Sequence, residues 1–215
     1  MKRLFFLAAC AVISLGVHAG AKYRAVVIDT VCNAPLSEMQ KTAERFCRQF
    51  QSCPDSLFEW AYVDLKEDHS QKKTKESKSV IELEYKDRTY DPKTLTGDVA
   101  IDIYVLSVRW WKDTHLGTRC THSVSTKAPY THTSHLTASY SGSLLEGGNC
   151  IIALEPITPT TTRVHYVFDL TFGRVLATFI SDKIWRNAIE WRFGIILSNL
   201  IEYAETGTVV PKRED

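Results

Sequence analysis

The segment Leu176–Ala204 constrains the fold more than any other part of the chain, because it is long, largely apolar and free of proline. Apolar residues recur along it every three or four positions, which is the spacing of one helical face: Ile180, Ile184, Ala188, Trp191 and Ile195. Its uninterrupted apolar runs are far shorter than the about 20 residues that span a bilayer. The sequence therefore predicts a long amphipathic helix whose apolar face packs on the rest of the protein, with or without a ligand between them.

The first residues have the layout of a secretory signal peptide. Lys2 and Arg3 supply the positive charge, Leu4–Val17 forms the apolar run, and Ala19 ends a small-residue cleavage site. We therefore expect cleavage before Gly20 and a periplasmic or secreted protein.

The remaining length suits a single domain. The chain has 215 residues, 44% of them hydrophobic, and one domain holds roughly 100–200 residues around one core. We expect a signal peptide at 1–19, one domain at 20–207 and a C-terminal tail at 208–215. A lipid anchor at Cys10 is the weaker interpretation, because fewer residues precede it than the about 7–15 apolar residues that a signal needs.

The charge balance gives no indication of a nucleic-acid partner. Loss of Lys2 and Arg3 lowers the basic count from 26 to 24 against 25 acidic residues, which leaves a net charge of −1. Domains that bind nucleic acid carry a clustered excess of positive charge instead.

Cleavage would leave five cysteines in a compartment where disulfides persist: Cys32, Cys47, Cys53, Cys120 and Cys150. Cys47 and Cys53 are close in sequence at the end of an expected helix, and Cys120 and Cys150 lie in later strand-like segments. These two pairs are the candidate disulfides. Buried free thiols fit each pair equally well.

The order of elements predicts an α+β fold. A β-branched strand at the start runs into a helix that Pro35 begins, with Leu36, Met39, Ala43 and Phe46 on one face. Alternating patterns predict strands at 23–29, 57–65, 81–85, 99–108, 118–126, 129–141, 150–154 and 163–172. We expect a curled antiparallel β-sheet wrapped around the long C-terminal α-helix.

Three stretches of the chain resemble the START-like, helix-grip superfamily, which includes pollen allergens and bacterial polyketide cyclases. They are VVIDTVCNAPLSEMQ at 26–40, NCIIALEPITPTTTRVHYVFDLTFG at 149–173 and GRVLATFISDKI at 173–184. The chain departs from the Asp-Pro-Gly of many bacterial members, with Thr171-Phe172-Gly173 before the last helix. The resemblance implies a helix-grip fold with an elongated cavity between sheet and helix, in which family members mostly bind lipids, sterols or polyketides.

Strand parity and helix spacing select side chains that would line such a cavity, with ordinary core packing as the alternative for each. They are Trp60, Leu83, Ile103, Val105, Phe168, Ile184, Ala188 and Trp191. Arg109 shares the parity of Ile103 and would then point inward, toward a carboxylate or a ligand headgroup, with solvation at the strand's end as the alternative. Trp110 and Trp111 beside it suit a cavity entrance or a transient membrane contact. Gly194 in the helix interior indicates close packing or a bend.

The polar residues favour binding over catalysis. Cys120, His122, His132 and His135 form the densest group of metal-ligand types, but His132 and His135 point to opposite faces of a strand, so no metal or cofactor is predicted. Our hypothesis is non-catalytic binding or carriage of a lipid-like molecule. The alternatives are a cyclase- or hydrolase-like enzyme that uses the same cavity, and a structural interaction module with a filled core. The sequence leaves the oligomeric state open.

Overall fold

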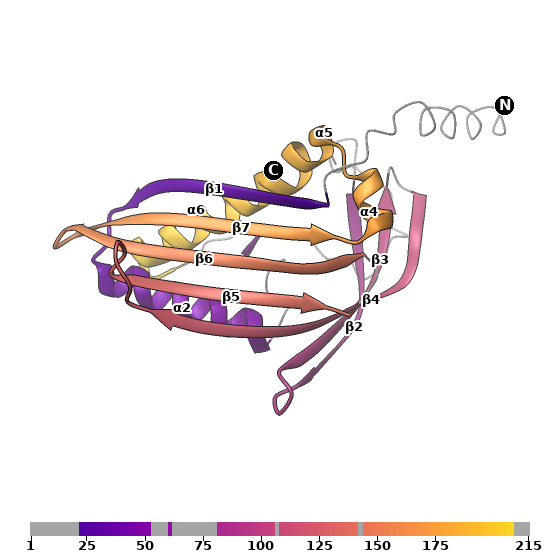
Figure 1. Cartoon of the computed structure of the whole chain (residues 1–215), viewed down its shortest axis with the longest axis horizontal. Helices are drawn as coiled ribbons and strands as arrows, with labels where there is room; N and C mark the ends of the chain where they lie inside the picture. Colours follow the sequence, from indigo (N-terminus) through magenta and orange to yellow (C-terminus); the bar gives the residue numbers. More distant parts are fainter. Residues whose placement is uncertain (1–21, 53–59, 62–80, 106–107, 142–143, 209–215) are drawn as a thin grey trace.

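An antiparallel sheet organises this computed structural model, which describes residues 22–52, 60–61, 81–105, 108–141 and 144–208 (Figure 1). Its strands are β1 (Tyr23–Cys32), β2 (Ile81–Asp91), β3 (Thr96–Val105), β4 (Val108–Ser125), β5 (His132–Tyr140), β6 (Leu145–Thr158) and β7 (Thr161–Phe172). The helices are α2 (Leu36–Ser52), α4 (Arg174–Phe179), α5 (Asp182–Ile184), the π-helical turn η1 (Trp185–Glu190) and α6 (Trp191–Thr206). The seven strands follow the order β1-β7-β6-β5-β4-β3-β2.

The sheet is curled, so it has a concave and a convex face. In Figure 1, β3 and the first part of β4 turn away from the direction of β5, β6 and β7. The pairing registers shift between Tyr85 and Asp87 in β2 and between Ile101 and Ile103 in β3. Such bulges bend a strand and increase its twist. They separate a small apolar cluster in the bent part from the main core: Val99, Ile101, Ile103 and Leu144.

Two helices cover the concave face of the sheet (Figure 1). The buried stripe of α2 includes Met39, Ala43, Phe46 and Phe50, and that of α6 includes Phe193, Ile196, Leu197 and Leu200. On the opposite side of the interface, Val164, Tyr166 and Phe168 alternate along β7 and are buried as their spacing predicts. The predicted α+β, helix-grip fold is therefore confirmed.

The C-terminal segment is not the single helix that its periodicity predicts. The chain breaks at Ile180 and Ser181, and the Ser181 hydroxyl accepts the Ile184 amide at 3.3 Å, which caps the helix that follows. The π-helical turn then adds a residue to the helical path. An added residue rotates everything after it by roughly 100°. Trp191 is consequently 43% exposed, and Phe193 takes the buried position.

Two strand predictions were also wrong. The apolar run at 99–108 is the end of β3 and the start of β4, because the chain turns between Val105 and Val108, which pair with each other. Trp111 consequently lies inside β4, opposite Ile103, and does not end a strand. In the predicted strand at 57–65, Trp60 is helical and Ala61 lies in a turn, while the other positions fall outside the described residues.

A buried polar group lies between α2 and the concave face. His132 is 1% exposed, with its Nδ1 3.0 Å from Gln40 Nε2 and its Nε2 3.0 Å from Ser134 Oγ. His122 lies on the same face of the neighbouring strand, and its Nε2 is buried without a partner among the described residues. Burial lowers the pKa of both histidines, although nearby Glu44 acts in the opposite direction.

We expect the free energy of unfolding to fall as the pH drops below about 6.5. In the unfolded chain, histidines take up protons near their ordinary pKa of about 6.5, whereas folded His122 and His132 take them up only at lower pH. Their contribution is therefore complete above that pH and is lost as the pH falls toward the lowered pKa values. Urea unfolding at a series of pH values measures the slope.

The control for this prediction is the double variant His122→Gln with His132→Gln. Asp98 raises the pKa of His115, so the effect of pH on stability through His115 is opposite to that through His122 and His132. The difference in slope between the wild type and the double variant is therefore more informative than the stability curve of one protein. The double variant should lose stability less steeply on acidification. Equal slopes in the two proteins would contradict the assignment.

Candidate functional site

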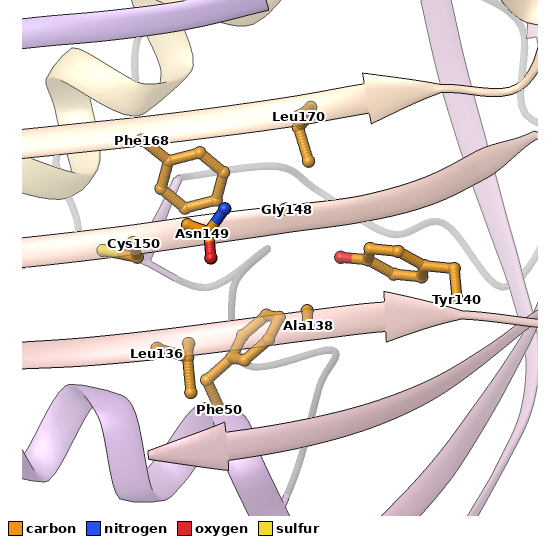
Figure 2. Close-up of a pocket in the computed structure, with 9 residues that line it drawn as sticks. All are labelled: Phe50, Leu136, Ala138, Tyr140, Gly148, Asn149, Cys150, Phe168 and Leu170. Atoms are coloured by element: carbon orange, nitrogen blue, oxygen red, sulfur yellow. The ribbon is translucent and has the colours of Figure 1, made fainter. Parts of the chain in front are cut away.

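A small space lies between the sheet and the helices among the described residues. A cavity of about 10 Å³ remains there, lined by Phe50, Leu136, Ala138, Tyr140, Gly148, Asn149, Cys150, Phe168 and Leu170 (Figure 2). Figure 2 shows aromatic rings from three elements around it: Phe50 of α2, Tyr140 of β5 and Phe168 of β7. About 10–15 Å³ of such volume holds one water molecule. This cavity cannot hold a lipid.

Aromatic contacts join α6 and the preceding helical turn to β7. The rings of Phe168 on β7 and Phe193 on α6 stack with centroids 3.8 Å apart. Trp185 meets Phe193 at 6.0 Å and Phe172 at 6.2 Å, both edge-on. Such pairs contribute about 0.5–1.5 kcal/mol beyond the area that they bury. The helix–sheet interface is therefore packed core at these positions.

A larger hollow lies on the outside, between the edge strand β1 and α6. It has a volume of about 400 Å³ and is lined by Ile28, Thr30, Trp191, Gly194, Ile195, Leu197, Ser198 and Ile201. We call it the β1–α6 groove. Sites for small molecules measure about 300–1,000 Å³ and are mostly apolar. The groove meets both criteria, and no residue that lines it has an ionisable side chain.

Gly194 and Trp191 give the groove its shape. A Cβ atom built on Gly194 would have no heavy atom within 4 Å, so the residue provides open space rather than the close packing that its position suggested. Trp191 forms part of the wall, and its ring lies 4.3 Å from the Arg192 guanidinium. Arg192 Nη1 also donates to the Ala61 carbonyl at 3.0 Å, which holds that guanidinium in place.

The structure does not bring the predicted lining residues together in one cavity. Phe168 lines the small interior cavity, Trp191 lines the groove, and Ile184 is half-buried against the main core. Trp60 packs edge-on against Phe46, and Ile103 belongs to the separate cluster in the bent part of the sheet. The side chains of Leu83, Val105 and Ala188 lie outside the described residues.

Sequence reasoning missed most residues of the groove. Ile28 and Thr30 share a face of β1, but no pattern in the sequence indicated that this face is partly open. Gly194, Ser198 and Ile201 reach the groove because the π-helical turn rotates α6. The one available signal was Gly194 itself, since glycine in a helix interior costs about 1 kcal/mol relative to alanine.

Arg109 lies on the convex face, contrary to the prediction that it points inward. The turn after Val105 places it opposite Tyr104, so parity counted from Ile103 does not apply. Its Nη1 donates to Asp102 at 3.2 Å, and Asp102 is fully buried. Burial acts to raise the pKa of Asp102, but the Asp113 amide at 2.7 Å and the neighbouring cations outweigh it and lower that pKa. Arg109 therefore neutralises a buried carboxylate.

The predicted disulfides are not formed. Cys47, Cys120 and Cys150 are buried free thiols, and Cys53 lies outside the described residues. Strand β5 separates Cys120 from Cys150, so at about 4.8 Å per strand they are roughly 10 Å apart, beyond the reach of a disulfide. Burial raises the pKa of Cys47 and of Cys120 to about 12, which keeps both thiols protonated.

Two further polar pairs link neighbouring strands. His165 Nδ1 lies 2.8 Å from Asp29, and Asp169 accepts a hydrogen bond from Asn149 at 3.0 Å. Within the described ranges, no three His, Cys, Asp or Glu residues are grouped so that they could hold a metal ion. No helix among them is both long and apolar enough to cross a bilayer.

Comparison with known proteins gives similarity to solved structures only. No family model matches the chain, and no curated protein does. A conserved protein from Geobacillus kaustophilus is 11% identical, with a TM-score of 0.45 over 84% of this chain and 95% of that one. The Zhui aromatase/cyclase from Streptomyces sp. R1128 is 7% identical, with a TM-score of 0.41 over 87% and 99%. Norcoclaurine synthase from Thalictrum flavum is 5% identical, with a TM-score of 0.39 over 87% and 96%.

Gly148 should be far less tolerant of substitution than Gly147. A Cβ on Gly148 would lie 2.8 Å from the Asp169 carbonyl oxygen and 2.9 Å from a Leu170 methyl, whereas on Gly147 the nearest atom is 3.4 Å away. We expect Gly148→Ala to lower the free energy of unfolding by about 1–3 kcal/mol. Gly147→Ala should change it by less than about 0.5 kcal/mol. Denaturant unfolding of both variants measures the difference, and equal effects would refute the packing described around the cavity.

Proposed function

We propose that this protein binds an apolar small molecule in the β1–α6 groove and performs no chemistry on it. The observation that carries the proposal is the groove itself, with its volume of about 400 Å³ and its largely apolar lining. An apolar ligand in such a site gains about 25 cal/mol per Å² of apolar surface removed from water. The half-exposed Trp191 ring is the largest such surface in the lining.

The same lining supports binding rather than catalysis. General acid–base catalysis needs an ionisable group within hydrogen-bond reach of the reacting atoms. The groove residues supply only two hydroxyls, those of Thr30 and Ser198. The buried histidines offer no substitute, since His132 is 1% exposed beneath α2.

The proposed setting is the periplasm or the extracellular space, with a lipid-like ligand. The charged, apolar and small-residue segments of 1–19 support export. Transient contact with a membrane would allow loading, and the exposed rings of Tyr23 and Trp191 are of the amphipathic kind found at membrane interfaces.

A second candidate is a structural interaction module. The observation in its favour is the interior cavity of about 10 Å³, which is too small for a lipid. The two candidates differ in whether the β1–α6 groove holds a ligand.

Substitutions at Gly194 separate these candidates. Gly194→Trp should fill the groove without a clash, because the Cβ position is open, and should weaken binding of the neutral fluorophore N-phenyl-1-naphthylamine at least tenfold. Gly194→Ala should retain binding and raise the free energy of unfolding by up to about 1 kcal/mol. Fluorescence titration and thermal unfolding give the two readouts.

The matched control is Lys41→Trp, which places the same indole on the exposed side of α2. It should bind the fluorophore as the wild type does. Wild-type affinity in Gly194→Trp, or no binding to the wild type, would reject the groove as the ligand site.

Export can be tested separately from ligand binding. When the full chain is expressed in a bacterial host with a secretion system, the intact mass of the recovered protein should match a chain that starts at Gly20. Protein that stays in the cytoplasm with residues 1–19 attached would overturn the proposed location.

A further inference from the structure

The charges around the β1–α6 groove indicate which ligands it accepts. No ionisable side chain lines it, so a charged group placed inside would lose water without gaining a counter-ion. The cation closest in sequence to the lining is Arg192, and its guanidinium is held by the Ala61 carbonyl and the Trp191 ring. The lining itself therefore offers no counter-ion to an anion, and the nearest cation in sequence lies behind the Trp191 wall.

Acidic residues follow the lining toward the C-terminal end of α6, where Arg45 lies over the Tyr203 ring. Glu202 and Glu205 belong to the last turns of α6, next to the lining residue Ile201, and Glu205 accepts the Asn33 amide at 2.6 Å. The C-terminal end of a helix also carries a partial negative charge of about half an elementary charge. Both features repel a carboxylate or phosphate at that end.

Two hydroxyls are available to a ligand. Thr30 on β1 and Ser198 on α6 belong to the lining, and within the described part of the chain neither has a hydrogen-bond partner. A hydroxyl both donates and accepts, so it suits an alcohol or a carbonyl oxygen. The lining thus combines an apolar surface with a small capacity for neutral hydrogen bonding.

The volume limits the ligand's size. A water-sized group occupies about 30 Å³ in a liquid. At that packing, a groove of about 400 Å³ holds roughly a dozen such groups. This corresponds to one medium-length chain or two to three fused rings held within the groove, while any larger part of a ligand would stay in contact with water.

We propose that the β1–α6 groove selects an uncharged ligand of roughly a dozen heavy atoms that carries one hydroxyl or carbonyl group, and that it discriminates against a carboxylate of the same size. This selectivity rests on the proposed function, because it concerns the same groove.

Matched probes test the selectivity. Binding of 1-decanol and of decanoate is measured at pH 7.5, below the micelle concentration, by displacement of N-phenyl-1-naphthylamine. Decanol should bind at least tenfold more tightly than decanoate. Equal or tighter binding of decanoate would overturn the selectivity while leaving the groove as the site. Failure of both probes to displace a bound fluorophore would also overturn it, whereas absence of fluorophore binding would remove the proposed function itself.

Variants show whether a preference for decanol comes from the hydroxyls of the groove or only from the greater hydrophobicity of an alcohol. The double variant Thr30→Val with Ser198→Ala removes both hydroxyls and should weaken decanol binding about fivefold relative to its effect on fluorophore binding, since one hydrogen bond contributes about 1 kcal/mol. Ser198→Lys supplies the missing cation and should reverse the preference toward decanoate. If decanol affinity is unchanged in the double variant, or if Ser198→Lys leaves the preference as in the wild type, the groove does not recognise its ligand in the proposed way.

Discussion

The stacking of Phe193 on Phe168 fixes how the C-terminal helix meets the sheet. With their centroids 3.8 Å apart, these rings set the rotation of α6 about its own axis. The rotation puts Leu197 and Leu200 into the core and directs Trp191 outward. The same rotation leaves the β1–α6 groove open beside Trp191.

This arrangement moves the candidate site from the inside of the fold to its edge. The helix-grip resemblance implies a cavity between sheet and helix, and the pocket that Phe50, Tyr140 and Phe168 line there measures only about 10 Å³. At the edge strand the sheet ends, so no further described strand closes the space beside Ile28 and Thr30. An open groove leaves part of its ligand in contact with water, which suits reversible binding and release better than permanent enclosure.

Polar networks support the curled sheet on both faces. On the convex side, buried Asp102 binds the Asp113 amide and Arg109 where the registers shift, so the carboxylate stabilises the bent part. On the concave side, His132 and Ser134 link the sheet to α2 through Gln40. Buried polar groups of this kind are costly unless they are paired, and so they favour one particular geometry.

By itself, the sequence determined the order of the elements. Pro35 marks the start of α2, the alternation of Val164, Tyr166 and Phe168 marks β7, and the apolar C-terminal segment marks the final helix. These predictions agree with the structure because each depends only on residues a few positions apart in the sequence. The α+β fold follows from their order.

Only the tertiary structure decided which face each residue occupies. The π-helical turn at Trp185–Glu190 shifts the helical spacing, and the turn between Val105 and Val108 shifts the strand alternation. The faces predicted for Trp191 and Arg109 were therefore wrong. Neither interruption follows from the local sequence, because a π-helical turn and a strand reversal each depend on packing against distant segments. The β1–α6 groove arises from how the packed aromatic rings orient α6, which is a contact between segments distant in sequence and leaves no local pattern.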